Sequence, residues 1–263
     1  MKGYYCILAF VFFSACSPAK KAVLNSPSSI SVQGKMFATL YQQRAAEYTA
    51  LCYQAYNFAR LRVNLWQQQT RPTAIVTDID ETVLDNSLYE AHQTLQGKDY
   101  DEKSWKEWTA KGSADTMPGA LSFLKYATSK GIEVFYITNR DETERAGTLA
   151  NLQRFNFPNA DNAHLVMKQG TSSKEQRRVN VLKTHSILML MGDNLADFSA
   201  LYDKKTSEER TSVTREMSAE FGSKFIVLPN PVYGDWESSL FRYNYKLTDT
   251  QKDSTIKSLL KSY

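Results

Sequence analysis

The side chains best suited to chemistry are two carboxylates, Asp78 and Asp80, which directly follow the β-favouring segment 74–77. Carboxylates this close repel each other and raise each other's pKa, so an apolar strand has no structural reason to end in them. They are tolerated when a cation lies among them, or when one of them attacks a substrate. The segment 74–82 therefore predicts a catalytic centre.

Polar side chains also follow two later apolar segments, 132–138 and 186–191. They are Thr138 and Asn139 at the end of the first segment, and Asp193 and Asp197 after the second. In an open α/β sheet, ligands bind at the carboxyl ends of the strands. We therefore expect all three clusters to converge on one site, and this convergence is stronger evidence than any one cluster.

The residue types suit phosphoryl chemistry. The simplest division of labour makes Asp78 the nucleophile, which attacks a phosphorus atom, and Asp80 the general acid and base. Asp193 and Asp197 supply hard oxygen ligands, which suit Mg²⁺ and its octahedral, all-oxygen preference. Lys174 begins a basic helix and could reach the phosphate, but a solvated helix lysine explains it equally well.

The elements that would position these residues alternate between strands and helices. We expect strands over residues 74–77, 132–138, 163–167, 186–191 and 224–228. We expect helices over residues 118–130, 141–155, 172–184, 194–202, 206–221 and 248–263, and a long helix or helix pair over residues 36–65, with the apolar positions Phe37, Leu40, Tyr48, Leu51, Ala55 and Phe58. Such alternation predicts an α/β fold with a parallel sheet covered on both faces.

The first residues have the pattern of an export signal. Residues 1–15 combine a positive start, an apolar core and small residues, which is typical of a secretory signal peptide. The sequence Phe13-Ser14-Ala15-Cys16 resembles a bacterial lipobox, in which Cys16 is lipidated and becomes the new N-terminus. Residues 16–34 predict a tether, followed by the folded domain over residues 35–263. A plain signal peptide cleaved elsewhere is the alternative.

The bulk composition narrows the class of protein. The chain of 263 residues is 42% hydrophobic, has a formal net charge of +4 and contains no dense basic block, so we expect no nucleic-acid polymer as a partner. Cys52 lies in a helical pattern and is interpreted as a buried small hydrophobe, not a nucleophile. The three histidines, His92, His164 and His185, have no ligand spacing and are interpreted as surface or packing residues.

Together these motifs resemble those of the haloacid dehalogenase (HAD) superfamily, and more closely its class C acid phosphatases, the DDDD group of bacterial lipoproteins. The first family signature is similar to residues 76–89, which contain Asp78 and Asp80. The second is similar to residues 188–198, which contain Asp193 and Asp197. The resemblance implies a Rossmann-like HAD core with a parallel sheet flanked by helices, a small cap insertion and an N-terminal helical extension.

The resemblance also implies roles for single residues. Asp78 would form an aspartyl-phosphate intermediate, and Asp80 would act as acid and base. The implied phosphate ligands are Thr138, Asn139 and Lys174. Mg²⁺ would be held by Asp78, the carbonyl group of Asp80 and Asp193, with Asp197 supporting the site.

The substrate should be selected by an insertion over residues 84–117, because loops of this length are usually functional. In the family, the aromatic residues that match Trp105 and Tyr233 can sandwich a flat leaving group such as a nucleobase or nicotinamide ring. Two aromatic faces would give stacking without strict base choice. For Trp108, packing of the insertion onto the core is an equally good interpretation.

The sequence thus predicts Mg²⁺-dependent hydrolysis of phosphomonoesters, either nucleoside 5′-monophosphates or related aromatic phosphates, by a protein that is lipid-anchored to the outer membrane of the cell envelope. A homodimer is left open. Dehalogenation is disfavoured because it does not need an acid at Asp80, and phosphomutases are disfavoured because they are normally cytosolic. The alternative from another class is a surface lipoprotein that binds a ligand such as haem on the same fold.

Overall fold

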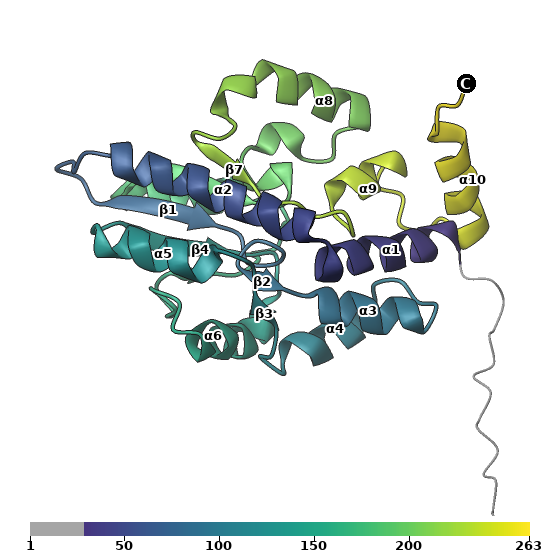
Figure 1. Cartoon of the computed structure of the whole chain (residues 1–263), viewed down its shortest axis with the longest axis horizontal. Helices are drawn as coiled ribbons and strands as arrows, with labels where there is room; N and C mark the ends of the chain where they lie inside the picture. The colour runs from purple at the N-terminus through teal and green to yellow at the C-terminus, as the bar shows by residue number, and fades with distance from the viewer. Residues whose placement is uncertain (1–28) are drawn as a thin grey trace, which may run out of the picture.

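The computed structural model describes residues 29–263, in which a five-stranded parallel sheet lies between helices (Figure 1). The strand order is β5-β4-β1-β6-β7. The strands are β1 (Thr73–Thr77), β4 (Glu133–Ile137), β5 (Leu165–Val166), β6 (Ser186–Gly192) and β7 (Phe225–Val227). The helices that follow them are α5 (Ala120–Ser129), α6 (Arg145–Arg154), α7 (Glu175–Thr184), α8 (Ser207–Glu216), α9 (Asp235–Leu240) and α10 (Asp249–Leu259). The predicted α/β fold class is confirmed.

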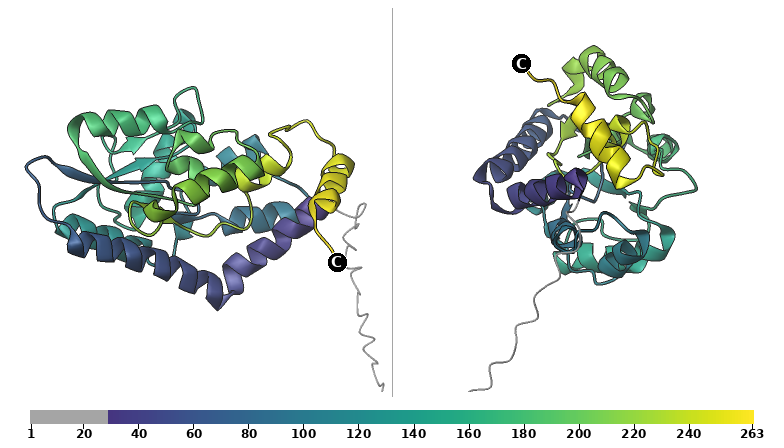
Figure 2. Two further views of the ribbon diagram at one scale, coloured as in Figure 1. Left: turned by 90° about the horizontal axis from the view of Figure 1, so that it is seen from above. Right: turned by 90° about the vertical axis from the view of Figure 1, so that its right-hand side faces the viewer.

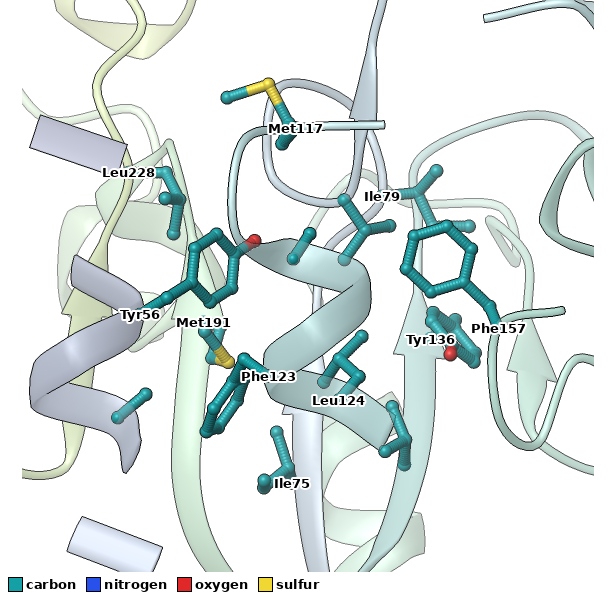
Figure 3. Packing of buried hydrophobic residues seen from close by; sticks show 14 of the residues in the cluster. Tyr56, Ile75, Ile79, Met117, Phe123, Leu124, Tyr136, Phe157, Met191 and Leu228 are labelled. Carbon is teal, nitrogen blue, oxygen red and sulfur yellow. The ribbon is translucent and has the colours of Figure 1, made fainter. Parts of the chain in front are cut away.

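The central strand β1 is buried on both faces, and its side chains alternate between two hydrophobic cores. Ile75 packs in the larger core beside Phe123 of α5, and the ring of Phe123 in turn contacts Tyr56 (Figure 3). Ala74 and Val76 point into the second core, which includes residues of α7 and β7. A strand covered on both sides has little room for charged side chains, which explains why the carboxylates appear only after β1 ends.

Two helices precede the sheet and meet at an angle (Figure 2): α1 (Ile30–Arg44) and α2 (Ala46–Leu65). The extended backbone at Ala45 separates them, so the predicted region is a helix pair. Helix α1 begins at residue 30, before the predicted end of the tether at residue 34. It contacts α10 and the helix α3, described below, whereas α2 contacts α5 and β7.

The prediction of which residues these two helices bury is partly wrong. Cys52 is fully buried as expected, together with Tyr48 and Ala55. Four other positions of the predicted face are exposed instead: Phe37, Leu40, Leu51 and Phe58. The buried stripe of α2 contains two tyrosines and four smaller residues, and it is shifted around the helix from Leu51 and Phe58: Tyr48, Cys52, Ala55, Tyr56, Ala59 and Val63.

The insertion over residues 84–117, called the cap below, forms a small unit at the carboxyl end of β1 (Figure 1). It contains β2 (Leu84–Asp85), α3 (Ser87–Leu95), α4 (Glu102–Thr109) and β3 (Asp115–Thr116), and β2 pairs with β3 in antiparallel fashion. The predicted helix 194–202 is instead two 3₁₀ turns, η2 (Leu195–Asp197) and η3 (Ala200–Tyr202). The side chain of Asn194 caps the first of these turns, and the side chain of Ser199 caps the second, so local hydrogen bonds replace a continuous helix.

The predicted signal peptide, Cys16 and most of the predicted tether lie outside the described residues. Among the helices of residues 29–263, none is long and apolar enough to cross a membrane.

Two of the histidines share one carboxylate at the sheet. The Nε2 atom of His164 lies 3.1 Å from Glu133 Oε2, and the Nε2 atom of His185 lies 3.4 Å from Glu133 Oε1. The Nδ1 atom of His164 lies 2.8 Å from Asp161. Burial opposes the charged form of His164, but hydrogen bonds to Asp161 and Glu133 outweigh it and raise its pKa, whereas the hydrogen bond from His164 lowers the pKa of Glu133.

We expect the ion pairs of this cluster to stabilise the folded protein only in mildly acidic solution. Because the pKa of His164 is raised, its contribution is complete below the ordinary value of 6.5 and is lost as the pH rises through the folded-state value. The contribution of Glu133 is present above its ordinary value of 4.5 and is lost as the pH falls. His164→Gln should therefore lower the Tm more at about pH 5.5 than at about pH 8.5. The exposed His92→Gln is the control, and an equal loss at both pH values would contradict the prediction.

Candidate active site

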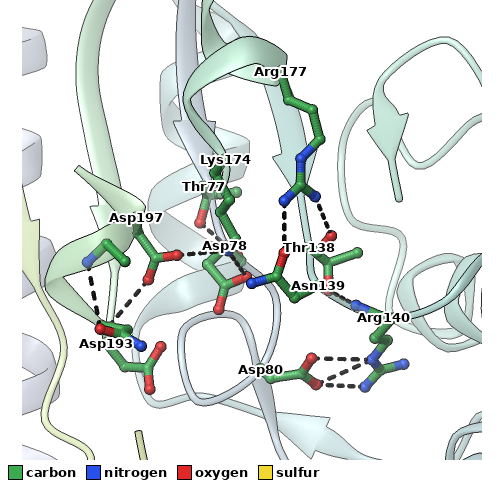
Figure 4. Close-up of polar contacts among 12 residues, drawn as sticks. Thr77, Asp78, Asp80, Thr138, Asn139, Arg140, Lys174, Arg177, Asp193 and Asp197 are labelled. Carbon is green, nitrogen blue, oxygen red and sulfur yellow. Dashed lines mark hydrogen bonds and ion pairs between the residues drawn. The ribbon is translucent and has the colours of Figure 1, made fainter. Parts of the chain in front are cut away.

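The carboxyl ends of three neighbouring strands bring the predicted polar clusters together (Figure 4). β1 lies between β4 and β6, so Asp78 after β1 is flanked by Thr138 after β4 and by Asp193 after β6. A backbone hydrogen bond of 2.9 Å from Asp78 N–H to the carbonyl of Met191 joins the first and third ends. The predicted convergence of the clusters is therefore seen in the structure.

Lys174 lies at the centre of the site. It is only 5% exposed, and its Nζ atom forms ion pairs with Asp78 Oδ1 and, at 2.6 Å, with Asp197 Oδ1. Burial opposes its positive charge, but Asp197 and Asp78 outweigh this effect and raise the pKa of Lys174. The interpretation of Lys174 as a solvated helix lysine is therefore wrong, because an ammonium group in this position links two parts of the acidic cluster.

Three carboxylates form a cluster that fits a divalent cation. Oxygen atoms of Asp78, Asp193 and Asp197 all lie within 4.8 Å of one another. Burial, the neighbouring Asp197 and the neighbouring Asp80 raise the pKa of Asp78 to about 7, although Lys174 acts against this shift. Burial and Asp197 likewise raise the pKa of Asp193 well above its usual value. A cation bound by these oxygens would relieve the repulsion that adds to the effect of burial on both pKa values.

The carboxylate of Asp80 is not part of that cluster, and a separate network holds it. Arg140 Nη2 donates to Asp80 Oδ1 at 2.7 Å, and Asn86 Nδ2 donates to the same oxygen at 2.8 Å. The indole N–H of Trp108 in turn donates to Asn86 Oδ1 at 2.9 Å. Trp108 is also packed against the larger core, which agrees with the interpretation that it joins the cap to the core. Asp80 is thus fixed by one residue after β4 and by the start of the cap.

Thr138 and Asn139 differ in their access to the site. Thr138 is fully buried, and its hydroxyl accepts a hydrogen bond of 3.0 Å from the backbone N–H of Arg140. Thr138 is absent from the residues that line the cavity described below, whereas Asn139 is one of them. The side chain of Asn139 accepts a hydrogen bond of 2.6 Å from Arg177 Nη2, so its orientation is set by α7.

The sequence analysis missed three buried arginines. They are Arg140, Arg177 and Arg178. Arg177 Nη1 donates to the carbonyl of Thr138 at 2.6 Å, and Arg178 Nη1 donates to the carbonyl of Asp197 at 2.7 Å. Helix α7 therefore ties the loop after β4 to the loop after β6. The adjacent pair Arg177-Arg178, three residues after Lys174, was the available signal.

A cavity of about 630 Å³ opens over these groups. Its lining includes Asp78, Asp80 and Lys174 together with the predicted substrate residues Trp105 of α4 and Tyr233. The ring of Trp105 packs edge-on against Tyr89 with 5.1 Å between ring centroids. The hydroxyl of Tyr233 is buried and has no hydrogen-bond partner in the described part of the chain.

The far end of the same cavity is lined by charged residues from distant segments. Lys35 of α1 lies 2.6 Å from Asp99 of the cap and 3.1 Å from Glu237 of α9, and Lys252 of α10 lies 3.3 Å from Asp99. Burial raises the pKa of Glu90 to about 7, although Lys35 acts against this shift. Carboxylates here would accept hydrogen bonds from hydroxyl groups of a bound molecule.

Comparisons with known proteins place this site in a family. A family model described as HAD superfamily, subfamily IIIB (Acid phosphatase) matches residues 14–236. The structure of the class C acid phosphatase from Bacillus anthracis is similar, with a TM-score of 0.85 and 40% identity over 89% of this chain and 98% of that chain. A second structure of that enzyme, with tungstate bound, gives the same TM-score of 0.85 and the same identity of 40% over 89% of this chain and 99% of that chain.

Curated proteins give weaker matches to part of the chain. The Stem 31 kDa glycoprotein of Glycine max is 27% identical over 59% of this chain. Acid phosphatase 1 of Solanum lycopersicum is 23% identical over 60% of this chain. The match spans 57% of the length of each of these two relatives.

Proposed function

Since the chain belongs to the class C acid phosphatases of the HAD superfamily, subfamily IIIB, we propose that it hydrolyses phosphomonoesters through an aspartyl-phosphate on Asp78. The observation that carries this proposal is the buried contact of Lys174 with both Asp78 and Asp197 at the strand ends. A lysine held between a nucleophile and the acidic cluster can neutralise phosphoryl oxygens as they arrive. Tungstate, which is bound in one structure of the Bacillus anthracis enzyme, is a negatively charged oxyanion, as phosphate is.

In this mechanism Asp78 and Asp80 have different roles. An oxygen of Asp78 attacks phosphorus, and the phosphorus–oxygen bond to the leaving group breaks. Asp80 protonates the leaving oxygen and later takes a proton from the water that hydrolyses the aspartyl-phosphate, which releases phosphate and restores Asp78. Arg140 and Asn86 donate hydrogen bonds to the carboxylate of Asp80 and would position it for both proton transfers.

Mg²⁺ is the cofactor that fits the acidic cluster, because its ligands are all oxygen atoms. Asp78 and Asp193 would hold it, together with the carbonyl of Asp80, and Asp197 would support the site through its contact with Lys174. When bound, Mg²⁺ offsets the repulsion between carboxylates and phosphate and polarises the phosphoryl group.

Hydrolysis of an aryl phosphate should depend on this cation. Removal of divalent cations with a chelator should reduce the rate by at least about 10²-fold, and added Mg²⁺ should restore it. The measurement is release of p-nitrophenol across a series of pH values, with and without chelator. A rate that the chelator leaves unchanged would contradict the role of the cation. Absence of hydrolysis at every pH would favour the alternative, a lipoprotein that only binds a ligand such as haem.

The preferred substrates are proposed to be nucleoside 5′-monophosphates or related aromatic phosphates, so that the enzyme acts as a 5′-nucleotidase. The support is the position of Trp105 and Tyr233 in the lining of the cavity that also contains Asp78. An aromatic face stacks on any flat leaving group, and the charged far end of the cavity can accept hydrogen bonds from sugar hydroxyls.

Loss of the Trp105 ring should therefore affect flat substrates selectively. Trp105→Ala should raise KM for a nucleoside 5′-monophosphate by about 5- to 150-fold, the equivalent of one stacked base, and should change KM for glycerol phosphate little. The measurement is phosphate release over a range of substrate concentrations. Leu95→Ala, at an exposed position of the same cap, is the control. An equal rise of KM for both substrates would show that Trp105 does not select the leaving group.

We also propose that Cys16 carries a lipid that anchors the protein to the outer membrane of the cell envelope. Support comes from the lipobox-like residues 13–16, which precede the described part of the chain. Detergent-phase partitioning of the wild-type protein and of Cys16→Ser tests the anchor, and equal partitioning would refute it. The homodimer left open by the sequence can be examined by sedimentation of the same samples.

A further inference from the structure

A second cavity, of about 370 Å³, lies at the amino ends of the strands, opposite the active site at their carboxyl ends. Its lining includes Thr73 and Ser186, the first residues of β1 and β6, and Arg62 and Trp66 at the end of α2. In Figure 1 this is the end of β1 that receives the chain from α2, away from the cap. Asp78 is five positions after Thr73 along the extended chain, which corresponds to about 16 Å at ~3.3 Å per residue.

Three side chains of this cavity have buried polar atoms that find no hydrogen-bond partner among residues 29–263. They are the Nε atom of Arg62, the Nε1 atom of Trp66 and the hydroxyl of Thr73. Thr73 is only 4% exposed, so bulk water does not reach its side chain freely. In folded proteins, nearly all buried polar groups are hydrogen-bonded, and three exceptions in one cavity need an explanation.

The chemistry of these atoms indicates what would satisfy them. The guanidinium N–H of Arg62 and the indole N–H of Trp66 are donors only, and the hydroxyl of Thr73 can donate as well. All three are therefore satisfied by a group that accepts several hydrogen bonds. Within residues 29–263, Arg62 forms no ion pair, so its positive charge also lacks a counter-ion.

The charge of the lining residues also favours an anion here. Arg62 and Lys224 are cationic and Glu220 is anionic, so these three lining residues carry a net charge of +1. The register between β1 and β6 shifts beside the cavity, because Ala74 pairs with Ile187 and Ile75 pairs with Met189. Such a bulge locally disrupts the ladder and bends the strand at the cavity wall. The carbonyl end of α2 opposes an anion, and the guanidinium group of Arg62 in its last turn offsets this effect.

We propose that this cavity is a binding site for a small oxyanion, a phosphate or carboxylate group held by Arg62, Trp66 and Thr73. The site is separate from the catalytic cluster and uses none of its residues. Phosphate would make it a sensor of the reaction product, whereas a carboxylate would make it a site for a different metabolite class. Phosphate and a carboxylate would bind to the same donors, and titration with each anion distinguishes them.

The indole N–H groups give one NMR signal for each tryptophan, which allows the two sites to be followed separately. The chain has four tryptophans, and Trp66→Phe identifies the signal of Trp66. Inorganic phosphate, succinate and chloride are titrated at constant ionic strength. We expect the Trp66 signal to shift in a saturable manner with phosphate, with succinate or with both, but not with chloride. The Trp105 signal reports the active-site cavity independently.

Substitutions then test the assigned donors. Arg62→Gln should weaken the response of Trp66 at least tenfold, whereas Arg44→Gln, which removes the same charge at an exposed site of α1, should leave it unchanged. Hydrolysis of an aryl phosphate by Arg62→Gln should equal that of the wild type, which shows that the variant is folded. No saturable shift of Trp66 up to about 50 mM oxyanion, or an unchanged response in Arg62→Gln, would overturn the proposal. Neither result would bear on the catalytic role of Asp78.

Discussion

An Asp78→Asn variant should hydrolyse an aryl phosphate at least about 10⁴-fold more slowly than the wild-type protein, because a neutral amide cannot form the aspartyl-phosphate. The substitution should leave the fold intact, since asparagine has the same shape as aspartate. Lys174 keeps its 2.6 Å ion pair with Asp197, so no buried positive charge is left without a partner. Release of p-nitrophenol and the Tm of the variant measure the two effects.

A second variant separates loss of the nucleophile from loss of the general acid and base. In Asp80→Asn, p-nitrophenolate leaves without protonation, so the first step should still occur, whereas hydrolysis of the aspartyl-phosphate should be slow. We therefore expect a burst of one p-nitrophenol per protein in Asp80→Asn and no burst in Asp78→Asn. Asp115→Asn, at an exposed position of the cap, is the control for the loss of one carboxylate. Turnover retained by Asp78→Asn would remove Asp78 as the nucleophile.

The parts of the site that were predictable from the sequence are local in the chain. Asp78 directly follows β1, and Asp193 directly follows β6, so each carboxylate can be recognised from its neighbours in the sequence. Because parallel strands end at the same edge of a sheet, local patterns at two strand ends were enough to place both carboxylates near each other. The α/β fold class rests on the same kind of local evidence.

The contacts that hold these carboxylates were not predictable, because they join distant segments. Arg140 reaches Asp80 across 60 positions in the sequence, and Lys35 reaches Asp99 across 64. No spacing rule connects such residues, and each of them has an ordinary surface role in most sequences. The face that α2 buries is a similar case, since it is set by contacts with α5 and β7 and not by the spacing of apolar residues within the helix.

The position of Asp197 depends on the absence of a side chain at Gly192. A Cβ atom added to this residue would lie 2.3 Å from Asp197 Oδ2 and 2.5 Å from Asp197 Cβ. Contacts this short cannot persist, so Asp197 or the end of β6 must move in a Gly192→Ala variant. Because Asp197 carries one of the two ion pairs of Lys174, a displacement there also disturbs the contact of Lys174 with Asp78.

Gly192→Ala should therefore reduce kcat by about 10²-fold or more, because a misplacement of about 1 Å within a catalytic site has effects of this size. Overpacking should also lower the stability by about 1–3 kcal/mol, which urea unfolding can measure. Gly34→Ala is the matched control, because this exposed residue of α1 has no atom within 4 Å of an added Cβ. The control should be neutral or slightly stabilising, since alanine favours a helix over glycine. Unchanged kcat in Gly192→Ala would mean that Lys174 does not need the observed position of Asp197.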